Sequence, residues 1–291
     1  MSLVEENLLL GPVILKFIIL EMDNFSLKDK VIIVTGGTGI LGEAFIQGIV
    51  SAGGIVGILG RNEKVAQERA AAVKAAGGKA MPLIADVMKE DELLAARDKV
   101  LAEFGRIDGL VNGAGGNMPG GIIQPDTSVF KLNMEGLRQV MELNLWGTMI
   151  PTQVFGETMA DTGKGSIVNI SSMASQRVIT KVLGYTLAKT AIDAYTQWFA
   201  VEMANRHGDK LRMNAIAPGF FLTEQNRALL TQPDGSYTDR GNLVLKQTPF
   251  KRFGEPGELI GALVWLLSDA SKFVTGTVIN VDGGFAVNSG V

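Results

Sequence analysis

The sequence predicts a single α/β domain with a doubly wound parallel sheet of about seven strands. Short apolar runs without period-two alternation recur along the chain, as is typical of parallel strands buried on both faces. Helical patterns separate several of these runs, as crossovers between parallel strands require. The composition supports a large core, because 46% of the residues are hydrophobic and 20% are charged.

Apolar runs mark the expected strands in chain order. They lie at residues 30–35, 55–59, 80–85, 107–112, 166–171, 212–217 and 277–282. Helical patterns occupy residues 62–78, which end at Gly-Gly, and residues 90–105, which carry an apolar stripe; a longer helix is expected to begin near Tyr185. One long irregular region covers about 223–256. A loop of that size is usually a lid or disordered, and we interpret it as a substrate lid.

An apolar extension over residues 1–21 precedes the domain, which we assign to residues 22–291. The run LLLGPVILKFIIL follows Glu5 and Glu6, where a signal peptide would carry basic residues. The run is interrupted by Pro12 and Lys16 and is too short to span a bilayer. We therefore expect no export, no membrane partner and a cytoplasmic location.

Charge and residue types exclude several function classes. A net charge of −3 and a pI of about 5.4 argue against nucleic acid as a partner. The chain has no cysteine and a single histidine, His207, which excludes disulfides and cysteine-histidine metal sites and argues against a serine-histidine-acid hydrolase. Since Gly208 follows it, we expect His207 to be a cation at a helix C-terminus. No metal is predicted.

A glycine-rich loop, TGGTGILG at residues 35–42, connects the first strand to the first helix. Its G-x-G-x-x-G spacing and its strand-loop-helix context predict dinucleotide binding on a Rossmann fold. Bare backbone lets a pyrophosphate approach the N-H groups of the helix N-terminus. The expected contacts are Gly36, Gly37, Thr38, Gly39, Ile40, Leu41 and Gly42.

The end of the second strand favours NADP over NAD. An NAD-preferring fold would place an acidic residue here for the ribose hydroxyl, but this chain has Gly60 followed by Arg61 and Asn62. Arg61 can pair with a 2′-phosphate. NAD stays open, because the same arginine is also consistent with a solvated residue at a helix start.

Eight motifs follow one another in the order of a known family. They are TGGTGILG, ADV (85–87), NGAG (112–115), NLWG (144–147), NISS (169–172), YTLAK (185–189), PGFFLT (218–223) and VDGGF (281–285). Over residues 30–286 the chain resembles the short-chain dehydrogenase/reductase superfamily. It departs at Gly113, where the family usually has asparagine, and in a glycine spacing that resembles the extended, epimerase-like branch. The short segment after Lys189 favours the compact branch.

The resemblance implies a four-residue catalytic site. Tyr185 would exchange a proton with the substrate oxygen, and Lys189, one helical turn away, would lower the pKa of the phenol and hold the nicotinamide ribose. Ser172 occupies the carbonyl-binding position, and its neighbour Ser171 would point the other way. Asn144 would anchor a water relay to Lys189.

The resemblance also implies cofactor contacts outside the glycine loop. They are Asp86 and Val87 at the adenine, Asn112, Ala114 and Gly115 along the ribose, Tyr185 and Lys189 at the nicotinamide ribose, and Pro218, Gly219, Phe221 and Thr223 near the carboxamide. Phe221 replaces the aliphatic residue that is usual in the family.

The segment between the serine and the tyrosine suggests an anionic small-molecule substrate. It carries Gln176, Arg177 and Lys181, with Asn117 on the opposite lip. The chain is similar to sugar-acid members of the family, of the mannonate oxidoreductase (fructuronate reductase) and gluconate 5-dehydrogenase types. Alternatively, these charged side chains are surface residues that contact only solvent.

Other functions remain open at this point, namely a reductase of another carbonyl such as a 3-oxoacyl thioester, an epimerase or lyase, or a non-catalytic nucleotide-binding module. The resemblance further implies a homo-oligomer, either a tetramer or a dimer.

Overall fold

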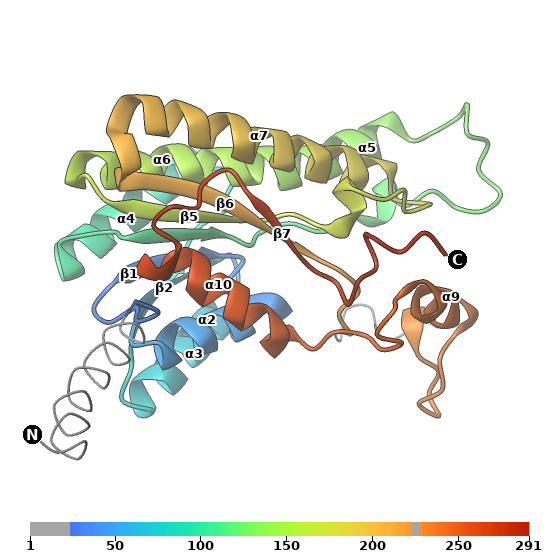
Figure 1. The fold of residues 1–291 in the computed structure, drawn as a ribbon, viewed down its shortest axis with the longest axis horizontal. Coiled ribbons are helices and arrows are strands. Elements are labelled where there is room, and N and C mark those ends of the chain that lie inside the picture. Colours follow the sequence, from blue (N-terminus) through green and yellow to red (C-terminus); the bar gives the residue numbers. More distant parts are fainter. Residues whose placement is uncertain (1–23, 223–226, 228, 291) are drawn as a thin grey trace, which may run out of the picture.

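The computed structural model describes residues 24–222, 227 and 229–290, so the apolar extension lies outside the described residues. Seven strands form one sheet in the order β3-β2-β1-β4-β5-β6-β7, and every neighbouring pair is parallel (Figure 1). The strands are β1 (Val31–Thr35), β2 (Ile55–Gly60), β3 (Lys79–Ile84), β4 (Gly109–Asn112), β5 (Gly165–Ile170), β6 (Leu211–Pro218) and β7 (Val278–Val281). The predicted fold class is confirmed.

Burial explains why the strands were recognisable as continuous apolar runs. Every residue of β1, β2, β4, β5 and β6 is buried, because helices cover both faces of the sheet. The edge strands β3 and β7 are only partly buried. All seven predicted runs coincide with strands, and their ends differ by at most two residues.

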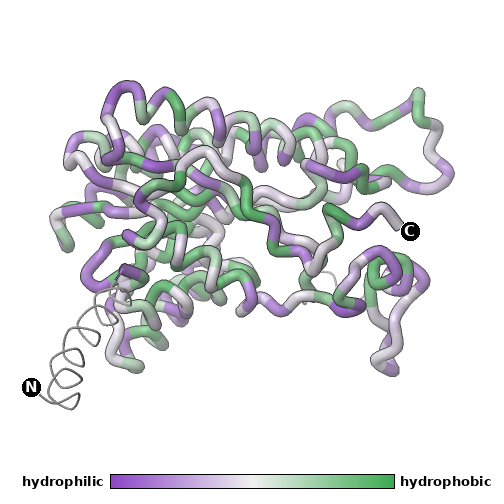
Figure 2. Tube along the Cα trace, in the orientation of Figure 1, coloured by the Kyte–Doolittle hydropathy of each residue, from purple (hydrophilic) through white to green (hydrophobic). Residues whose placement is uncertain are grey.

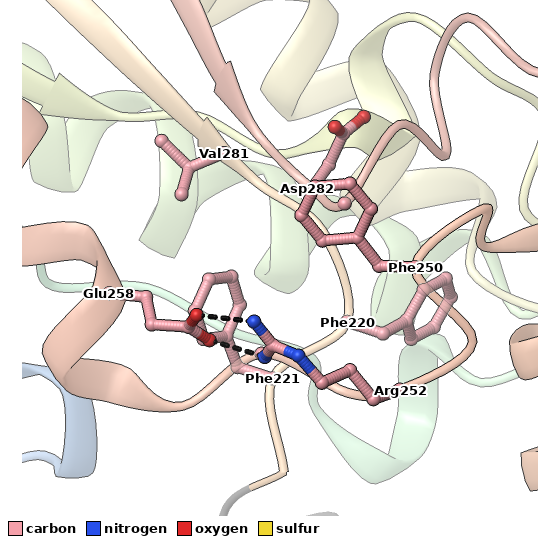
Figure 3. A pocket seen from close by; sticks show the side chains of 9 residues that line it. Phe220, Phe221, Phe250, Arg252, Glu258, Val281 and Asp282 are labelled. Carbon is pink, nitrogen blue, oxygen red and sulfur yellow. Dashed lines mark hydrogen bonds and ion pairs between the residues drawn. The ribbon is translucent and has the colours of Figure 1, made fainter.

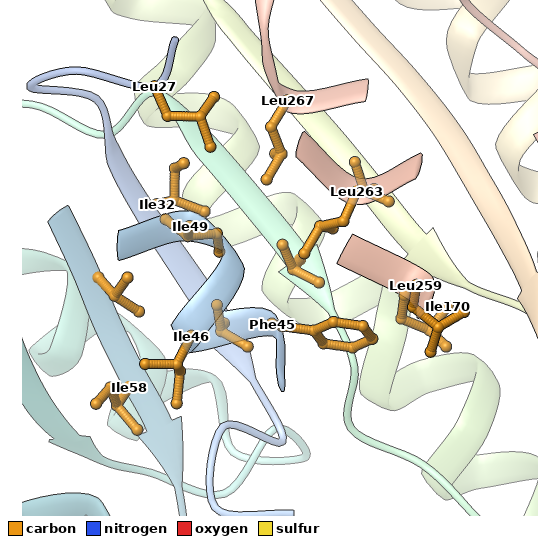
Figure 4. Packing of buried hydrophobic residues seen from close by; sticks show 14 of the residues in the cluster. Leu27, Ile32, Phe45, Ile46, Ile49, Ile58, Ile170, Leu259, Leu263 and Leu267 are labelled. Carbon is orange, nitrogen blue, oxygen red and sulfur yellow. The ribbon is translucent and has the colours of Figure 1, made fainter. Parts of the chain in front are cut away.

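One face of the sheet is covered by α2 (Ile40–Ser51), α3 (Glu63–Ala75) and α10 (Ile260–Leu267). Figure 4 shows Phe45 and Ile49 of α2 packed between Ile32 of β1 and Leu263 of α10. The 3-10 turn η5 (Pro256–Leu259) leads into α10 and η6 (Asp269–Ser271) follows it. This core fixes the start of α2, and therefore the glycine loop, against the sheet.

The opposite face carries α4 (Glu90–Phe104), α6 (Gly147–Thr162) and α7 (Leu183–His207), with α5 (Met134–Met141) at the end of this layer. Hydrophobic and hydrophilic residues alternate along these outer helices, as expected when one side of each packs on the sheet (Figure 2). Gly208 ends α7 with φ of 67°, and His207 lies in the last turn, so its predicted position at a helix C-terminus is confirmed. The turn η4 (Gly208–Lys210) then leads into β6.

The strand order reverses between β1 and β4, which lie side by side at the centre of the sheet. In open parallel sheets, ligands bind outside the carboxyl ends of the strands at such a switch point. The glycine loop leaves β1 there, and the turn η1 (Pro119–Gly121), the π-helical segment η2 (Glu142–Trp146) and the turn η3 (Met173–Ser175) follow β4 and β5 on the same edge.

The predicted irregular region is not irregular throughout, so that prediction is wrong over part of its length. Residues 239–247 form α9 (Asp239–Gln247), whose start is capped by Thr238 accepting from the N-H of Gly241 at 3.1 Å. A small separate core forms where Val244 of α9 packs with Leu230 and Phe253. No helix in the described part of the chain has the length and apolar character that a membrane crossing requires.

Candidate active site

The glycine loop packs against the loop that follows β4, which leaves no room for side chains. Gly36 has φ of 66°, and a Cβ there would lie 2.7 Å from the carbonyl oxygen of Gly113. A Cβ on Gly42 would overlap the carbonyl oxygen of Gly36. The two loops of the switch point therefore approach each other through bare backbone.

The start of α2 fits a dinucleotide pyrophosphate. Its N-cap, Gly39, has no side chain that could bond the first N-H groups of the helix, those of Ile40 and Leu41. Thr38 lies over Gly60, where a Cβ would be 2.5 Å from the Thr38 hydroxyl oxygen. Gly60, which stands where NAD-preferring folds have an acidic residue, is thus also required by the packing of Thr38.

Arg69 of α3 holds the glycine loop from behind, and the sequence patterns gave no sign of this. One terminal nitrogen, Nη1, donates to the carbonyl oxygens of Gly37 at 2.6 Å and Gly39 at 2.7 Å, and Nη2 pairs with Glu43 at 3.0 Å. These bonds turn the loop carbonyls towards the arginine. The loop is thereby fixed in one conformation, with its helix N-terminus left for an anion.

The predicted adenine side brings Arg61 and Asp86 together. Their side chains form an ion pair of 3.7 Å, in which the arginine side chain is 75% exposed. Val87 is buried. Asn62 caps α3 by accepting from the N-H of Val65 at 3.2 Å, which gives its side chain a structural partner.

Asn112 points into the core instead of into the cofactor cleft. Its Nδ2 donates to the hydroxyl of Thr152 and to Oδ1 of Asn169, both at 2.9 Å, while its Oδ1 has no hydrogen-bond partner among the described residues. The Thr35 hydroxyl accepts the N-H groups of Gly113 at 3.1 Å and Ala114 at 3.2 Å. The Asn112 side chain is therefore not available to a ribose.

Asn144 lies in the π-helical segment η2 and is fully buried. Its side chain exchanges two hydrogen bonds with the backbone of Gly116, at 2.8 and 3.0 Å, and also donates to the carbonyl of Val140 at 2.7 Å. A Cβ on Gly115 would lie 2.6 Å from the Asn144 Oδ1 and 3.5 Å from the Lys189 Nζ. The sequence-predicted Asn144, Gly115 and Lys189 are thus neighbours.

Ser172, Tyr185 and Lys189 meet where β5 ends against the start of α7. The Lys189 Nζ donates to the carbonyl of Ile170 at 2.7 Å and lies 5.4 Å from the centre of the Tyr185 ring. Ser172 caps the turn η3 by accepting from the N-H of Ala174 at 3.1 Å, and its side chain lies close enough to Tyr185 to lower the pKa of the phenol. Three of the four predicted catalytic side chains therefore form one cluster.

Burial dominates the electrostatics of this cluster. It raises the pKa of Tyr185, opposed by the hydrogen bond from Ser172, so the predicted lowering of this pKa by Lys189 is not found in the protein alone. Burial also lowers the pKa of Lys189 to about 8, opposed by the charge of Asp193. Asp193 is a second residue that the sequence patterns missed.

Two of the predicted substrate residues are bonded to the C-terminal strand and the segment after it. Gln176 exchanges two hydrogen bonds with the side chain of Asn280, at 2.7 and 2.8 Å. Arg177 donates to the carbonyls of Ala286 at 2.5 Å and Asn288 at 3.3 Å. The guanidinium thus has partners other than a substrate carboxylate.

The other two substrate candidates are exposed. Lys181 has φ of 73°, and its carbonyl accepts the N-H of Ile123 at 2.9 Å, which joins the segment after β4 to the segment before α7. Asn117 lies on the opposite lip.

The segment after β6 continues the cleft towards the predicted carboxamide contacts. Pro218 ends β6, and a Cβ on Gly219 would lie 2.6 Å from the Cα of Asp282. Phe221 is buried and bridges to Gly254, whereas Thr223 lies outside the described residues.

A cavity of about 200 Å³ opens beside this segment. Figure 3 shows its aromatic walls, Phe220, Phe221 and Phe250, and the paired hydrogen bonds of 2.7 and 2.6 Å between Arg252 and Glu258. Because these two charges neutralise each other, we do not assign an anionic substrate to this cavity.

Comparisons with known proteins agree with this geometry. Residues 38–286 match the family model described as enoyl-(acyl carrier protein) reductase. An uncharacterized oxidoreductase of Bacillus subtilis, UxuB, is 40% identical over 275 residues, which are 91% of this chain and 98% of that protein.

Two solved structures are also similar to this chain over most of its length. A candidate D-mannonate oxidoreductase from Haemophilus influenzae with bound NAD has a TM-score of 0.83 at 39% identity, covering 91% of this chain and 98% of that chain. A gluconate 5-dehydrogenase from Burkholderia cenocepacia in complex with NADP and tartrate has a TM-score of 0.79 at 31% identity, with the same coverage of 91% and 98%. The chain therefore belongs to the short-chain dehydrogenase/reductase family, as an oxidoreductase that uses a nicotinamide dinucleotide.

Proposed function

We propose that the protein catalyses the reversible oxidation of a secondary alcohol on a sugar acid, of the mannonate/fructuronate or gluconate type. The observation that carries the proposal is the cluster of Ser172, Tyr185 and Lys189 beside the glycine loop. The names of the similar structures, a candidate D-mannonate oxidoreductase and a gluconate 5-dehydrogenase, support the substrate class.

Each residue of the cluster has a distinct part in the proposed reaction. When bound, the nicotinamide supplies or accepts the hydride. Ser172 holds the substrate oxygen, and Tyr185 gives or takes its proton. Lys189 supplies a positive charge beside the phenol, which favours the phenolate that forms when the proton leaves. Asn144 fixes the backbone of Gly116, in the loop next to Lys189.

Removal of the Tyr185 hydroxyl tests the assignment. We expect Tyr185→Phe to lower kcat at least about a hundredfold while NADPH and NADH still bind, because the hydroxyl transfers the proton. Tyr195→Phe, on the same helix, is the matched control and should keep its activity. The measurement is absorbance at 340 nm with fructuronate, mannonate and gluconate, together with fluorescence titration of the cofactor. Undiminished turnover in Tyr185→Phe would refute the role of the tyrosine.

The anionic substrate is tested at Arg177. Its partners are backbone carbonyls of residues 286 and 288, so the side chain must exchange at least one of these bonds to take a carboxylate. We expect Arg177→Ala to raise KM for sugar acids about tenfold and to leave KM for an uncharged ketone unchanged. Activity confined to uncharged ketones or acyl thioesters would reject the sugar-acid proposal.

NADP is the proposed preference, on the basis of Gly60 and Arg61. The guanidinium of Arg61 is exposed and pairs only loosely, at 3.7 Å, with Asp86, so it can turn to a 2′-phosphate. We expect Arg61→Ala to raise KM for NADPH about tenfold, with KM for NADH unchanged. A wild-type enzyme that prefers NADH would overturn this part, and the NAD bound in one similar structure makes that comparison essential.

The proposal also includes a cytoplasmic homo-oligomer, with residues 22–291 as one domain and residues 223–256 as its substrate lid. Exposed apolar side chains on α7, Trp198 and Val201, support association. Light scattering on the purified protein separates a tetramer from a dimer, and a monomer would reject the oligomer.

A further inference from the structure

Asp193 lies on the same face of α7 as the proposed catalytic pair. It follows Lys189 by one helical turn and Tyr185 by two, so the three side chains project towards the end of β5 in a row. The proposed reaction assigns no part to this carboxylate.

The carboxylate of Asp193 is bonded to the segment that carries Ser172. Its Oδ1 accepts a short hydrogen bond from the hydroxyl of Ser171. The side chain of Ser175 lies close enough to lower the pKa of Asp193, and its hydroxyl donates to the carbonyl of Ser172 at 2.7 Å. Ser171 is buried, and its N-H donates to the carbonyl of Ile216 in β6 at 2.7 Å. Asp193 therefore holds Ser171, the residue that precedes Ser172, and Ser175 closes the turn onto the Ser172 carbonyl.

A second bond joins the same segment to α7. The Lys189 Nζ donates to the carbonyl of Ile170 at 2.7 Å. The bonds of Ile170 and Ser171 to the helix therefore hold the two residues that precede Ser172. Loss of the Asp193 bond would leave this segment with the Ile170 bond.

Asp193 is also a negative charge next to Lys189. Burial lowers the pKa of Lys189 to about 8, and Asp193 is the charged group in the described part of the chain that opposes this shift. The other groups that face the lysine are the phenol of Tyr185, the carbonyl of Ile170 and the neutral loop at Gly115. Neutralising Asp193 would therefore favour the uncharged lysine.

We propose that Asp193 is a positioning residue of the reaction, which holds the Ser171–Ser175 turn so that Ser172 meets Tyr185, and which keeps Lys189 positively charged. This inference rests on the proposed roles of Ser172, Tyr185 and Lys189.

Three variants separate the two parts of the proposal. Asp193→Asn keeps the size of the side chain and an acceptor for Ser171 but removes the charge. Ser171→Ala removes the hydroxyl donor and keeps the charge. Glu202→Gln is the control, because Glu202 is another carboxylate of α7 and pairs with Arg206, at 2.9 Å, away from the cluster.

The first readout needs no substrate. The 13Cε resonance of Lys189, identified by its absence in Lys189→Met, reports the protonation of the lysine as pH is varied. We expect a midpoint near pH 8 in the wild type. It should fall by about one unit in Asp193→Asn and stay in place in Ser171→Ala and Glu202→Gln. An unchanged midpoint in Asp193→Asn would overturn the charge role, whatever the substrate is.

The second readout is turnover of fructuronate with NADPH. We expect kcat at pH 7.5 to fall about tenfold in Asp193→Asn, and its alkaline limb to move to lower pH, because a lysine with a lower pKa loses its proton earlier. Ser171→Ala should lower kcat without moving the limb. The Kd of NADPH should stay within about twofold in both variants.

The outcomes distinguish this inference from the proposed function. An inactive Tyr185→Phe with an Asp193→Asn variant that keeps wild-type kcat and pH profile would refute the inference alone. An active Tyr185→Phe would refute the proposed function. If Asp193→Asn lost thermal stability and NADPH binding together with kcat, Asp193 would be a general structural residue, and the positioning role would be rejected.

Discussion

Gly115 offers a sharp test of the site geometry, because its neighbour Gly116 is a matched control. Both glycines have positive φ, 155° and 147°, which side chains rarely adopt. A Cβ on Gly115 would lie 2.6 Å from the Asn144 Oδ1, whereas a Cβ on Gly116 would meet nothing within 4 Å. Substitution by alanine therefore adds the same kind of backbone strain at both positions and a clash at only one.

The expected magnitudes follow from this difference. Backbone strain of this kind costs about 1–3 kcal/mol, so we expect Gly116→Ala to lower the free energy of unfolding by about 2 kcal/mol. In Gly115→Ala the buried Asn144 must also move, which breaks at least one of its three side-chain hydrogen bonds, of 2.7 to 3.0 Å. A buried polar group left without its partner costs about 1–3 kcal/mol. The total for Gly115→Ala is then about 4 kcal/mol.

Urea unfolding of the two variants measures the difference in stability, and kcat measures the effect on the cluster. Because the same Cβ would lie 3.5 Å from the Lys189 Nζ, we expect kcat to fall about a hundredfold in Gly115→Ala. In Gly116→Ala we expect a loss of less than about fivefold. Equal stability and equal kcat in the two variants would refute the packing of Asn144 against this loop.

Three further predictions concern residues outside the catalytic cluster. Arg69→Met should raise the Kd of NADPH about tenfold and leave kcat at saturating cofactor unchanged, because the glycine loop loses two hydrogen bonds. An unchanged Kd in fluorescence titration would contradict this. Burial raises the pKa of Asp269, but Lys30 and other nearby lysines lower it to about 2. The carboxylate therefore stabilises the fold above the pKa it has in the unfolded chain, and this contribution is lost as pH falls through its pKa in the folded protein. We expect Asp269→Asn to lose less stability than the wild type between about pH 4 and pH 2. Urea midpoints at several pH values measure this, and parallel curves would count against it. Asn62→Ala should lower the free energy of unfolding by about 1 kcal/mol through loss of the α3 cap, and an unchanged urea midpoint would reject that role.

The strands and the glycine loop could be predicted because their signals are local. A strand buried on both faces must be apolar throughout, and β1, β2 and β5 are. Helix α9 escaped prediction for the opposite reason. It is short, buries only Gly241 and Val244, and takes its stability from Leu230 and Phe253, which lie elsewhere in the chain.

The contacts of Arg69 and Asp193 at the site could not be predicted from the sequence. Each sits in an ordinary helical pattern, where a charged residue usually faces solvent. Their roles arise because the fold brings Arg69 to a loop 30 and 32 residues earlier in the chain, and Asp193 to a serine 22 residues earlier. No spacing rule within a helix contains that information.

The structure explains why Gly113 departs from the family motif. From the sequence it was a missing asparagine in a family motif. In the structure a Cβ at this position would lie 2.8 Å from the carbonyl oxygen of Thr35, while the Thr35 hydroxyl accepts the N-H of Gly113 at 3.1 Å. The loop after β4 therefore lies tightly against the end of β1, and the glycine follows from that approach. The same approach brings Ala114 beside Gly36 of the glycine loop, so this departure from the motif is consistent with a retained dinucleotide site.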